Sequence, residues 1–173
     1  MKMTDILPVE TWLALERTLG QDFGLCGCAY DAEGRTFTGS RVEANPFCPE
    51  LRANGGLAAI CAAAHQTLAA KARETRAPVI DECDAGLCKI CVPIIVDDTF
   101  VGVVGGCGCV MEGAEPDAFL VHKVTGLDQA RLEELAVQVP VLSAARAQEA
   151  AAMLEARVAE AVAGFLATRG DKA

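Results

Sequence analysis

The sequence predicts an α+β domain, in which an antiparallel sheet of about five strands is flanked by helices and followed by a long C-terminal helix. Three observations lead to this prediction. Segments with helical spacing of apolar residues alternate with segments rich in branched residues, in the order helix, two strands, helix, three strands, two helices. The strands are joined by short turns, which favour hairpins. The 173 residues, 52% hydrophobic and 23% charged, suit one globular core.

The first half of the chain predicts a helix, a hairpin and a second helix. Pro8 and Gly20 are typical of a helix start and a helix end. Gly55 and Gly56 are expected to break the long Ala-rich helix in which they lie. The elements expected here are a helix at 8–20, strands at 23–30 and 35–39, a loop at 40–49 and a helix at 51–76.

The second half predicts a strand pair followed by two helices. Pro78 favours an extended segment, Asp97 and Asp98 suit the turn between two strands, and Pro140 stops a helix. The elements expected here are strands at 79–83, 88–96 and 100–110, a loop at 112–126, and helices at 127–139 and 141–168.

The C-terminal helix is expected to form a unit of its own, residues 141–173, after a sensory unit at 1–140. Its apolar residues advance by alternating threes and fours, which predicts a packing seam. The seam packs either on the same helix of a second copy, giving a homodimer, or on the domain's own sheet. It consists of Ala151, Leu154, Val158, Ala161 and Phe165.

Composition excludes several classes of function. The net charge of -9 and the pI near 4.7 argue against nucleic-acid binding, which needs clustered Lys and Arg. No apolar run approaches the roughly 20 residues that span a membrane. The first ten residues lack the apolar stretch of a secretory signal, so we expect a cytoplasmic protein.

Nine cysteines dominate the chemistry. An odd and large number of thiols in an expected cytoplasmic chain points to metal binding or redox chemistry rather than to structural disulfides. Thiolates prefer soft centres, so an iron–sulfur cluster is the leading expectation and zinc the alternative. Three thiols crowd into nine residues at Cys83, Cys88 and Cys91. In a regular strand Cys88 and Cys91 point to opposite faces, whereas Cys26 and Cys28 share one face, as do Cys107 and Cys109.

The segment from Phe47 to Gly106 resembles the sensory domain of the PocR family, and the resemblance covers roughly residues 5–140. The residues that carry it are Phe47-Cys48, Cys61, Pro78-Val79 leading to Cys83, Ala85-Gly86-Leu87, Val92-Pro93-Ile94 and Gly105-Gly106. The resemblance implies a ligand sensor shaped like PAS and GAF domains. It also implies a separate signalling or transcriptional output partner, since the chain has no helix-turn-helix segment. Asp84 and Cys107 depart from the family pattern, in which His and Gln are expected.

The predicted metal site has Cys48, Cys61 and Cys83 as its leading ligands, with a fourth from Cys88, Cys91 or Cys107. His65 follows Cys61 by four residues on the same helical face and is a candidate for an additional contact. Other residues are expected to line or shield the bound group: Phe47, Cys28, Cys109, Gly105 and Gly106.

Three functions follow from these residues. The first is a sensor that holds a cysteine-ligated metal centre, and the second is a sensor of a small organic ligand with cysteines lining the pocket. The third is a thiol-disulfide oxidoreductase. A catalytic role is not expected, because no nucleophile elbow, phosphate-binding loop or oxyanion device accompanies the thiols.

Overall fold

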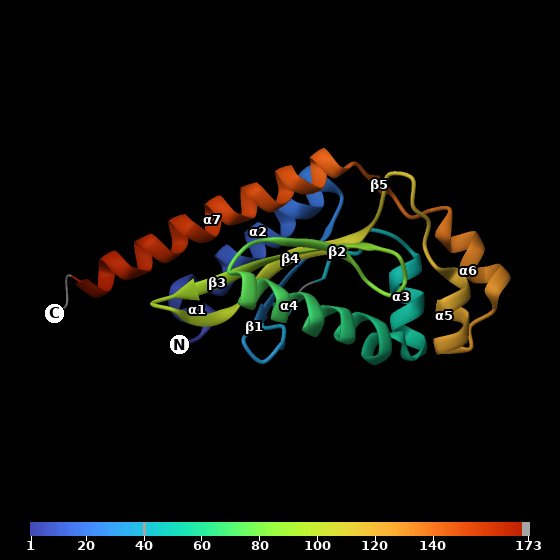
Figure 1. Ribbon diagram of the computed structural model, residues 1–173, viewed down its shortest axis with the longest axis horizontal. Coiled ribbons are helices and arrows are strands. Elements are labelled where there is room, and N and C mark those ends of the chain that lie inside the picture. Colours follow the sequence, from blue (N-terminus) through green and yellow to red (C-terminus); the bar gives the residue numbers. More distant parts are fainter. Residues whose placement is uncertain (40, 171–173) are drawn as a thin grey trace.

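The computed structural model describes residues 1–39 and 41–170 as three layers, with a sheet between two layers of helices (Figure 1). Helices α2 and α7 cover one face, and the helical path α3–η1–α4 covers the other. Helices α5 and α6 lie together at one end (Figure 1). The elements are α1 (Met3–Ile6), α2 (Val9–Phe23), β1 (Cys26–Asp31), α3 (Phe47–Leu51), η1 (Arg52–Ala62), α4 (Ala63–Thr75), β2 (Val79–Glu82), β3 (Cys88–Val96), β4 (Thr99–Met111), α5 (Ala118–Thr125), α6 (Gln129–Ala136), β5 (Val141–Leu142) and α7 (Ala144–Gly170).

The sheet has five strands, and the predicted α+β class is confirmed. Its order is β1-β4-β3-β2 with antiparallel pairing throughout, and β5 adds a short parallel pairing to β4. The long β3 and β4 form the centre, as expected from their branched and glycine-rich sequences.

The predicted return strand at 35–39 was wrong. After the turn at Asp31 only a single bridge forms, between Tyr30 and Thr36. The chain then leaves the sheet, because the hydroxyl of Thr38 donates to the buried carboxylate of Glu16 at 2.9 Å. The same Glu16 oxygen accepts from the backbone N–H of Ala29 at 2.9 Å, which fastens α2 to β1. The fifth strand is β5 instead.

The predicted loop at 112–126 was also wrong in part, because it contains α5. Asp117 caps this helix by accepting a hydrogen bond from the Leu120 N–H at 2.7 Å, and Gly126 ends it with φ +72°. Asp128 caps α6 in the same way through Arg131. Two short helices therefore replace one loop and one longer helix.

The predicted break in the long second helix is confirmed. The path from Phe47 to Thr75 is continuous, but η1 is a wide, π-type segment whose helical backbone is interrupted at Asn54 and Gly55. Gly55 has φ +93°, which L side chains rarely adopt. Segments of this type are frequent at functional sites.

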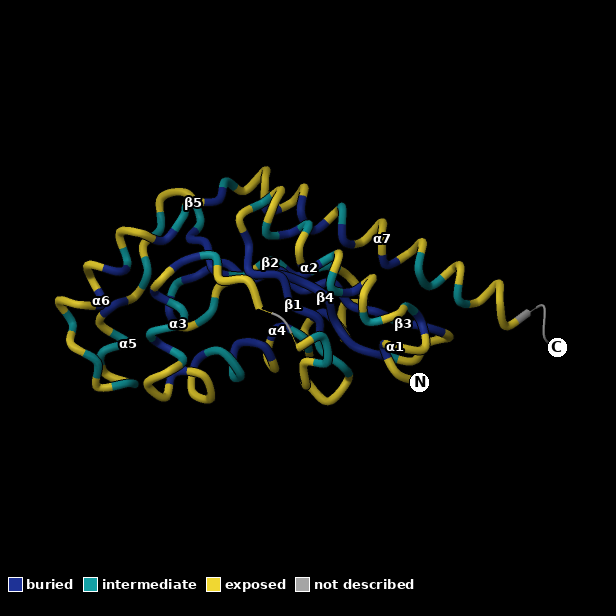
Figure 2. Tube along the Cα trace, turned by 180° about the vertical axis from the view of Figure 1, so that it is seen from behind, coloured by how far each residue is buried: buried dark blue, intermediate teal, exposed yellow. Residues whose placement is uncertain are grey.

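The main core lies between the sheet and the α2/α7 layer (Figure 2). Trp12 and Leu19 of α2 and Ile90 of β3 are fully buried in this one cluster. The predicted α7 seam packs on this core: Ala151, Leu154 and Val158 are buried, and Ala161 and Phe165 pack against it in part. The seam is therefore used within the domain.

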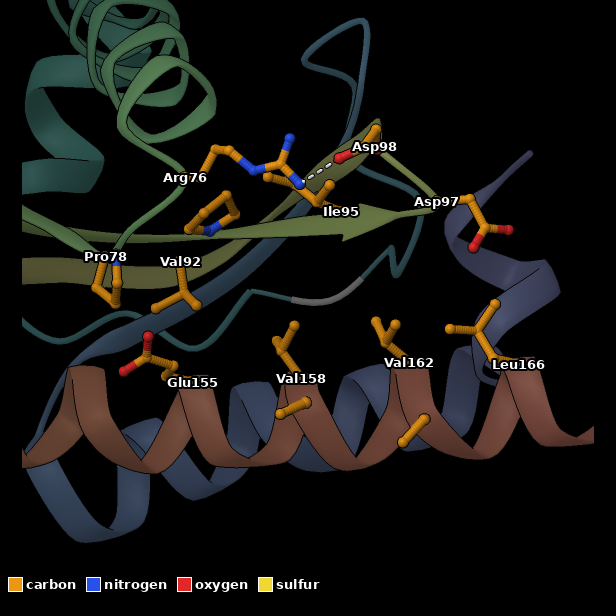
Figure 3. Close-up of a pocket in the computed structure, with 13 residues that line it drawn as sticks. Arg76, Pro78, Val92, Ile95, Asp97, Asp98, Glu155, Val158, Val162 and Leu166 are labelled. Carbon is orange, nitrogen blue, oxygen red and sulfur yellow. Dashed lines mark hydrogen bonds and ion pairs between the residues drawn. The ribbon is translucent and has the colours of Figure 1, made fainter.

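The C-terminal half of α7 rests less closely on the sheet (Figure 3). Val158 and Val162 face Ile95 of β3 across an open hollow, and an ion pair between Arg76 and Asp98, 2.8 Å apart, lies at its rim. None of the residues that line this hollow is a cysteine.

Within the described residues, no helix combines the length and the apolar character required to cross a membrane.

We predict that Gly27→Ala destabilises the domain, because a Cβ at Gly27 would lie 2.4 Å from the backbone carbonyl oxygen of Glu16. The loss in the free energy of unfolding should be about 1–3 kcal/mol, as for other overpacked sites. Gly164→Ala is the control. A Cβ at Gly164, in α7, would have no atom within 4 Å, so the substitution should raise the free energy of unfolding by up to about 1 kcal/mol. Urea unfolding followed by circular dichroism measures both, and equal effects would contradict the prediction.

Candidate functional site

The alternation of side chains in β3 and β4 gives the sheet two chemically different faces. We call the face under α2 and α7 the α7 face, and the opposite face the thiol face. On the α7 face β3 presents Ile90, Val92 and Ile94, all buried in the main core. On the thiol face the strand register places two rows side by side: Asp81, Lys89, Cys107 and Cys26, then Val79, Cys91, Gly105 and Cys28.

Helices and a turn bring further thiols to this face. Cys48 lies in α3, Cys61 lies near the end of η1, and Cys83 begins the turn after β2, where its carbonyl accepts from the Gly86 N–H at 2.8 Å. All three are partly exposed and pack against one apolar cluster that contains Phe47, Ile60 and Leu87.

Cys107 is the centre of the thiol set. A negative charge on Cys107 raises the pKa of each of the other eight cysteines, and a charge on Cys61 also raises the pKa of Cys48 and Cys83. These effects extend to Cys88 and Cys109 in the main core, so they do not define one site. Packing places Cys48, Cys61 and Cys83 on one apolar cluster, and their role as ligands stays a prediction.

Cys26 and Cys107 form a coupled pair across β1 and β4. The interaction between these two opposed thiols lowers the pKa of Cys107 and raises that of Cys26. The positive charges of Lys89, Arg41 and Arg52 also lower the pKa of Cys107. Cys107 is therefore the thiol of this site that most readily carries a negative charge.

Lys89 places a buried cation on the thiol face. Its residue is 5% exposed, and none of the ion pairs among the described residues includes it. Burial alone would lower the pKa of Lys89, but charges on Cys28, Cys107 and Cys91 raise it. The Lys89 ammonium lies 5.7 Å from the centre of the Tyr30 ring. The site is therefore prepared for negative charge.

Burial keeps the remaining thiols protonated. It raises the pKa of Cys48 and of Cys28 to about 12, and that of Cys91 to about 11. It also raises the pKa of Cys61 and Cys83. Such thiols become thiolates only when a cation or a metal compensates the charge.

The thiols are not at bonding distance around one ion. In the parts of the chain described, 1–39 and 41–170, no group of three or more His, Cys, Asp or Glu side chains is placed to hold a metal ion. Every cysteine is a free thiol.

Asn45 connects the two sides of the site. Its side-chain oxygen accepts from the Cys48 N–H at 2.8 Å, and its amide NH₂ donates to the Gly108 carbonyl at 2.5 Å and lies 3.4 Å from the Cys48 sulfur. The ion pair between Arg52 and Glu43 joins η1 to the segment before α3. The Asn45 contacts hold α3 against β4 beside Cys107.

The chain matches the family described as "Sensory domain found in PocR" over residues 5–164. It belongs to this family. No curated protein matches the chain, and no solved structure does. Membership favours ligand sensing over catalysis. The match extends beyond residue 140 and so includes most of α7, which packs in the same core as the sheet.

Several residues predicted for the site lie elsewhere in this PocR sensory domain. Cys88 and Cys109 face each other in the main core on the α7 face, and Gly106 packs against Leu25 there. Phe47 is fully buried in the apolar cluster behind Cys48.

The predicted opposite orientation of Cys88 and Cys91 agrees with this arrangement, but the expectation that Cys107 and Cys109 share a face does not. Gly108, with φ +101°, lies where the register between β3 and β4 shifts, and the shift turns Cys109 to the other side.

Three residues of the site were missed by sequence reasoning. Lys89 lies in an otherwise apolar strand. A single Lys in such a strand indicates a buried ammonium group, which needs negative charge nearby. Asn45 lies just before the start of α3, where an Asn side chain commonly accepts a hydrogen bond from a backbone N–H of the helix's first turn. Tyr30 stacks on His65 with ring centres 3.7 Å apart, and only the fold reveals this contact.

We predict that His65 makes the domain acid-sensitive. Burial, and then the charge of Lys89, lowers the pKa of His65 to about 4, and its buried Nδ1 lacks a hydrogen-bond partner. An unfolded histidine titrates near pH 6.5, so as the pH falls from there toward 4 the unfolded chain binds a proton that the folded domain does not. Stability is therefore full above about pH 6.5 and falls below it.

Between about pH 7.5 and about pH 4.5, His65 should lower the free energy of unfolding by on the order of 2–3 kcal/mol, and His65→Gln should remove this loss. Urea unfolding of metal-free protein at each pH measures it. His122→Gln, at the chain's other histidine, is the control. An unchanged pH profile in His65→Gln would contradict the assignment.

Proposed function

We propose that this sensory domain detects its signal through an iron–sulfur cluster bound at the thiol face by Cys48, Cys61, Cys83 and Cys107. The main support is that Cys48, Cys61 and Cys83 pack on one apolar cluster, and that these three thiols and Cys107 are all partly exposed. Thiolates are the usual protein ligands of such clusters.

The surrounding charges suit this group. Four thiolates and a cluster carry net negative charge, and Lys89, Arg52 and Arg41 supply positive charge at Cys107. The ligand thiols are partly exposed, so iron and sulfide can reach them. When bound, the cluster would supply a redox-responsive centre.

A cluster and a zinc ion place different demands on the spacing of their sulfur ligands. A single zinc ion requires all its sulfur ligands about 2.3 Å from one point, which forces the thiolates into mutual contact. In a cluster different thiolates bind different irons, so the sulfur atoms stay further apart.

The chain's own residues would contribute in three ways. Release of the thiol protons would couple binding to pH, since burial raises the pKa of Cys48, Cys61 and Cys83. Asn45 would hold Cys48 in place, and Lys89 would balance the charge.

The signal would leave through β3 and α7. Lys89 and Cys91 face the site, while their neighbours Ile90 and Val92 pack in the core that includes α7. A shift of β3 on binding would therefore move residues beneath α7. We propose a separate signalling or transcriptional partner as the recipient.

A small organic ligand is the second candidate. It is favoured by the buried Lys89 cation and the unpartnered Nδ1 of His65, which suit a carboxylate or hydroxyl group. In this case the thiols would line the pocket without binding metal.

We predict that protein purified under nitrogen is brown and contains iron and acid-labile sulfide in roughly equal amounts. Separate Ser replacements at Cys48, Cys61, Cys83 and Cys107 should each lower the iron content at least several-fold. Cys109→Ser is the matched control, because Cys109 lies on the α7 face, and it should retain the cluster. Colourless protein that contains zinc would contradict the cluster, and metal-free protein of unchanged stability would support the organic ligand.

A further inference from the structure

Two pairs of cysteines face each other across antiparallel strands. Cys26 opposes Cys107 between β1 and β4, and Cys88 opposes Cys109 between β3 and β4. Directly opposed residues in such strands have Cα atoms about 4.5 or 5.5 Å apart. A disulfide joins Cα atoms about 4.4–6.8 Å apart, so the backbone of either pair is spaced for one.

The two pairs differ in how their thiols are placed. Cys26 and Cys107 lie directly opposite each other in a regular part of the β1–β4 ladder, and Cys107 is partly exposed. Cys88 and Cys109 are 0% and 1% exposed in the apolar core, and the Cys109 thiol donates to the Gly24 carbonyl at 3.4 Å. Only the first pair combines direct opposition in a regular ladder with access from solvent, because the second pair lies at a register shift and is fully buried.

We propose that Cys26 and Cys107 are a reversible oxidation site, which closes into a cross-strand disulfide when the metal-free domain meets a hydroperoxide. One thiol attacks the peroxide and becomes a sulfenic acid, releasing water from hydrogen peroxide. The second thiol attacks that sulfur, an S–S bond forms, and a second water leaves. Overall two thiols lose two hydrogens and hydrogen peroxide is reduced to two waters; a dithiol reductant reverses the change.

This inference does not depend on the proposed cluster, because it concerns the metal-free chain. It has a consequence for any ligand of the thiol face. Oxidation removes the central thiol, Cys107, and leaves Cys48, Cys61 and Cys83 without it. A domain in the disulfide form would therefore be unable to bind a group that requires Cys107.

The test oxidises the metal-free, reduced 173-residue chain with hydrogen peroxide and divides the sample in two. In the first part the free-thiol count should fall from nine to seven and return to nine with dithiothreitol. In the second part the remaining thiols are blocked with iodoacetamide without reduction, and trypsin should yield fragment 18–35, which contains Cys26 and Cys28, joined to fragment 90–123, which contains Cys91, Cys107 and Cys109. Fragment ions of the joined peptide identify the two linked cysteines without any variant.

Variants separate the members of each fragment. Cys28→Ser, Cys91→Ser and Cys109→Ser should keep the link, whereas Cys26→Ser and Cys107→Ser should abolish it. A link from fragment 77–89, which contains Cys83 and Cys88, to fragment 90–123 would overturn the proposal. So would a link through Cys28, or nine thiols that remain free in the native protein while the urea-unfolded chain is oxidised. Iron content is measured in a separate experiment. A protein that binds no cluster can therefore still confirm or contradict the disulfide.

Discussion

The two central strands, β3 and β4, pack against an apolar core on one face of the sheet and carry thiols and a cation on the other. Every second residue of β3 enters an apolar core shared with α2 and α7, and the residues between them carry a cation and a thiol. Because the side-chain period of a strand is two, neither set moves without the other. Glycines in β4 allow the close packing: a Cβ at Gly105 would fall within bonding distance of the Ile90 carbonyl oxygen, and one at Gly102 would strike the Tyr30 carbonyl. The position of the thiols is thus set by packing on the far side of the sheet.

The buried ammonium group of Lys89 determines which ligands the thiol face favours. An ammonium removed from water is costly unless negative charge is nearby. No carboxylate pairs with Lys89 in the described part of the chain, so the thiols are its main source of negative charge. A thiol set of this kind favours partners that bring or keep negative charge, whether a metal–sulfide group or an organic anion.

The sequence was sufficient for the order of the main elements and for the break at Gly55, because periodicity and glycine placement are local signals. It also predicted Cys48, Cys61 and Cys83 as ligands; the fold packs all three on one apolar cluster, and their role as ligands stays a prediction. It was insufficient where long-range contacts decide. Segment 35–39 has strand-like residues, but Thr38 bonds to Glu16 and leaves the sheet. The side that Cys109 faces depends on a register shift at Gly108, which alternation alone does not reveal.

Asn45 gives the site a mechanical property. One amide group holds the start of α3 and the carbonyl of Gly108, which follows Cys107 directly. Strand β4 and helix α3 are therefore joined through two hydrogen bonds of one side chain. A displacement of β4 at this point would act on α3, and on η1, which continues the same helical path to Cys61. The Asn45 side chain therefore couples the position of Cys107 to that of Cys48.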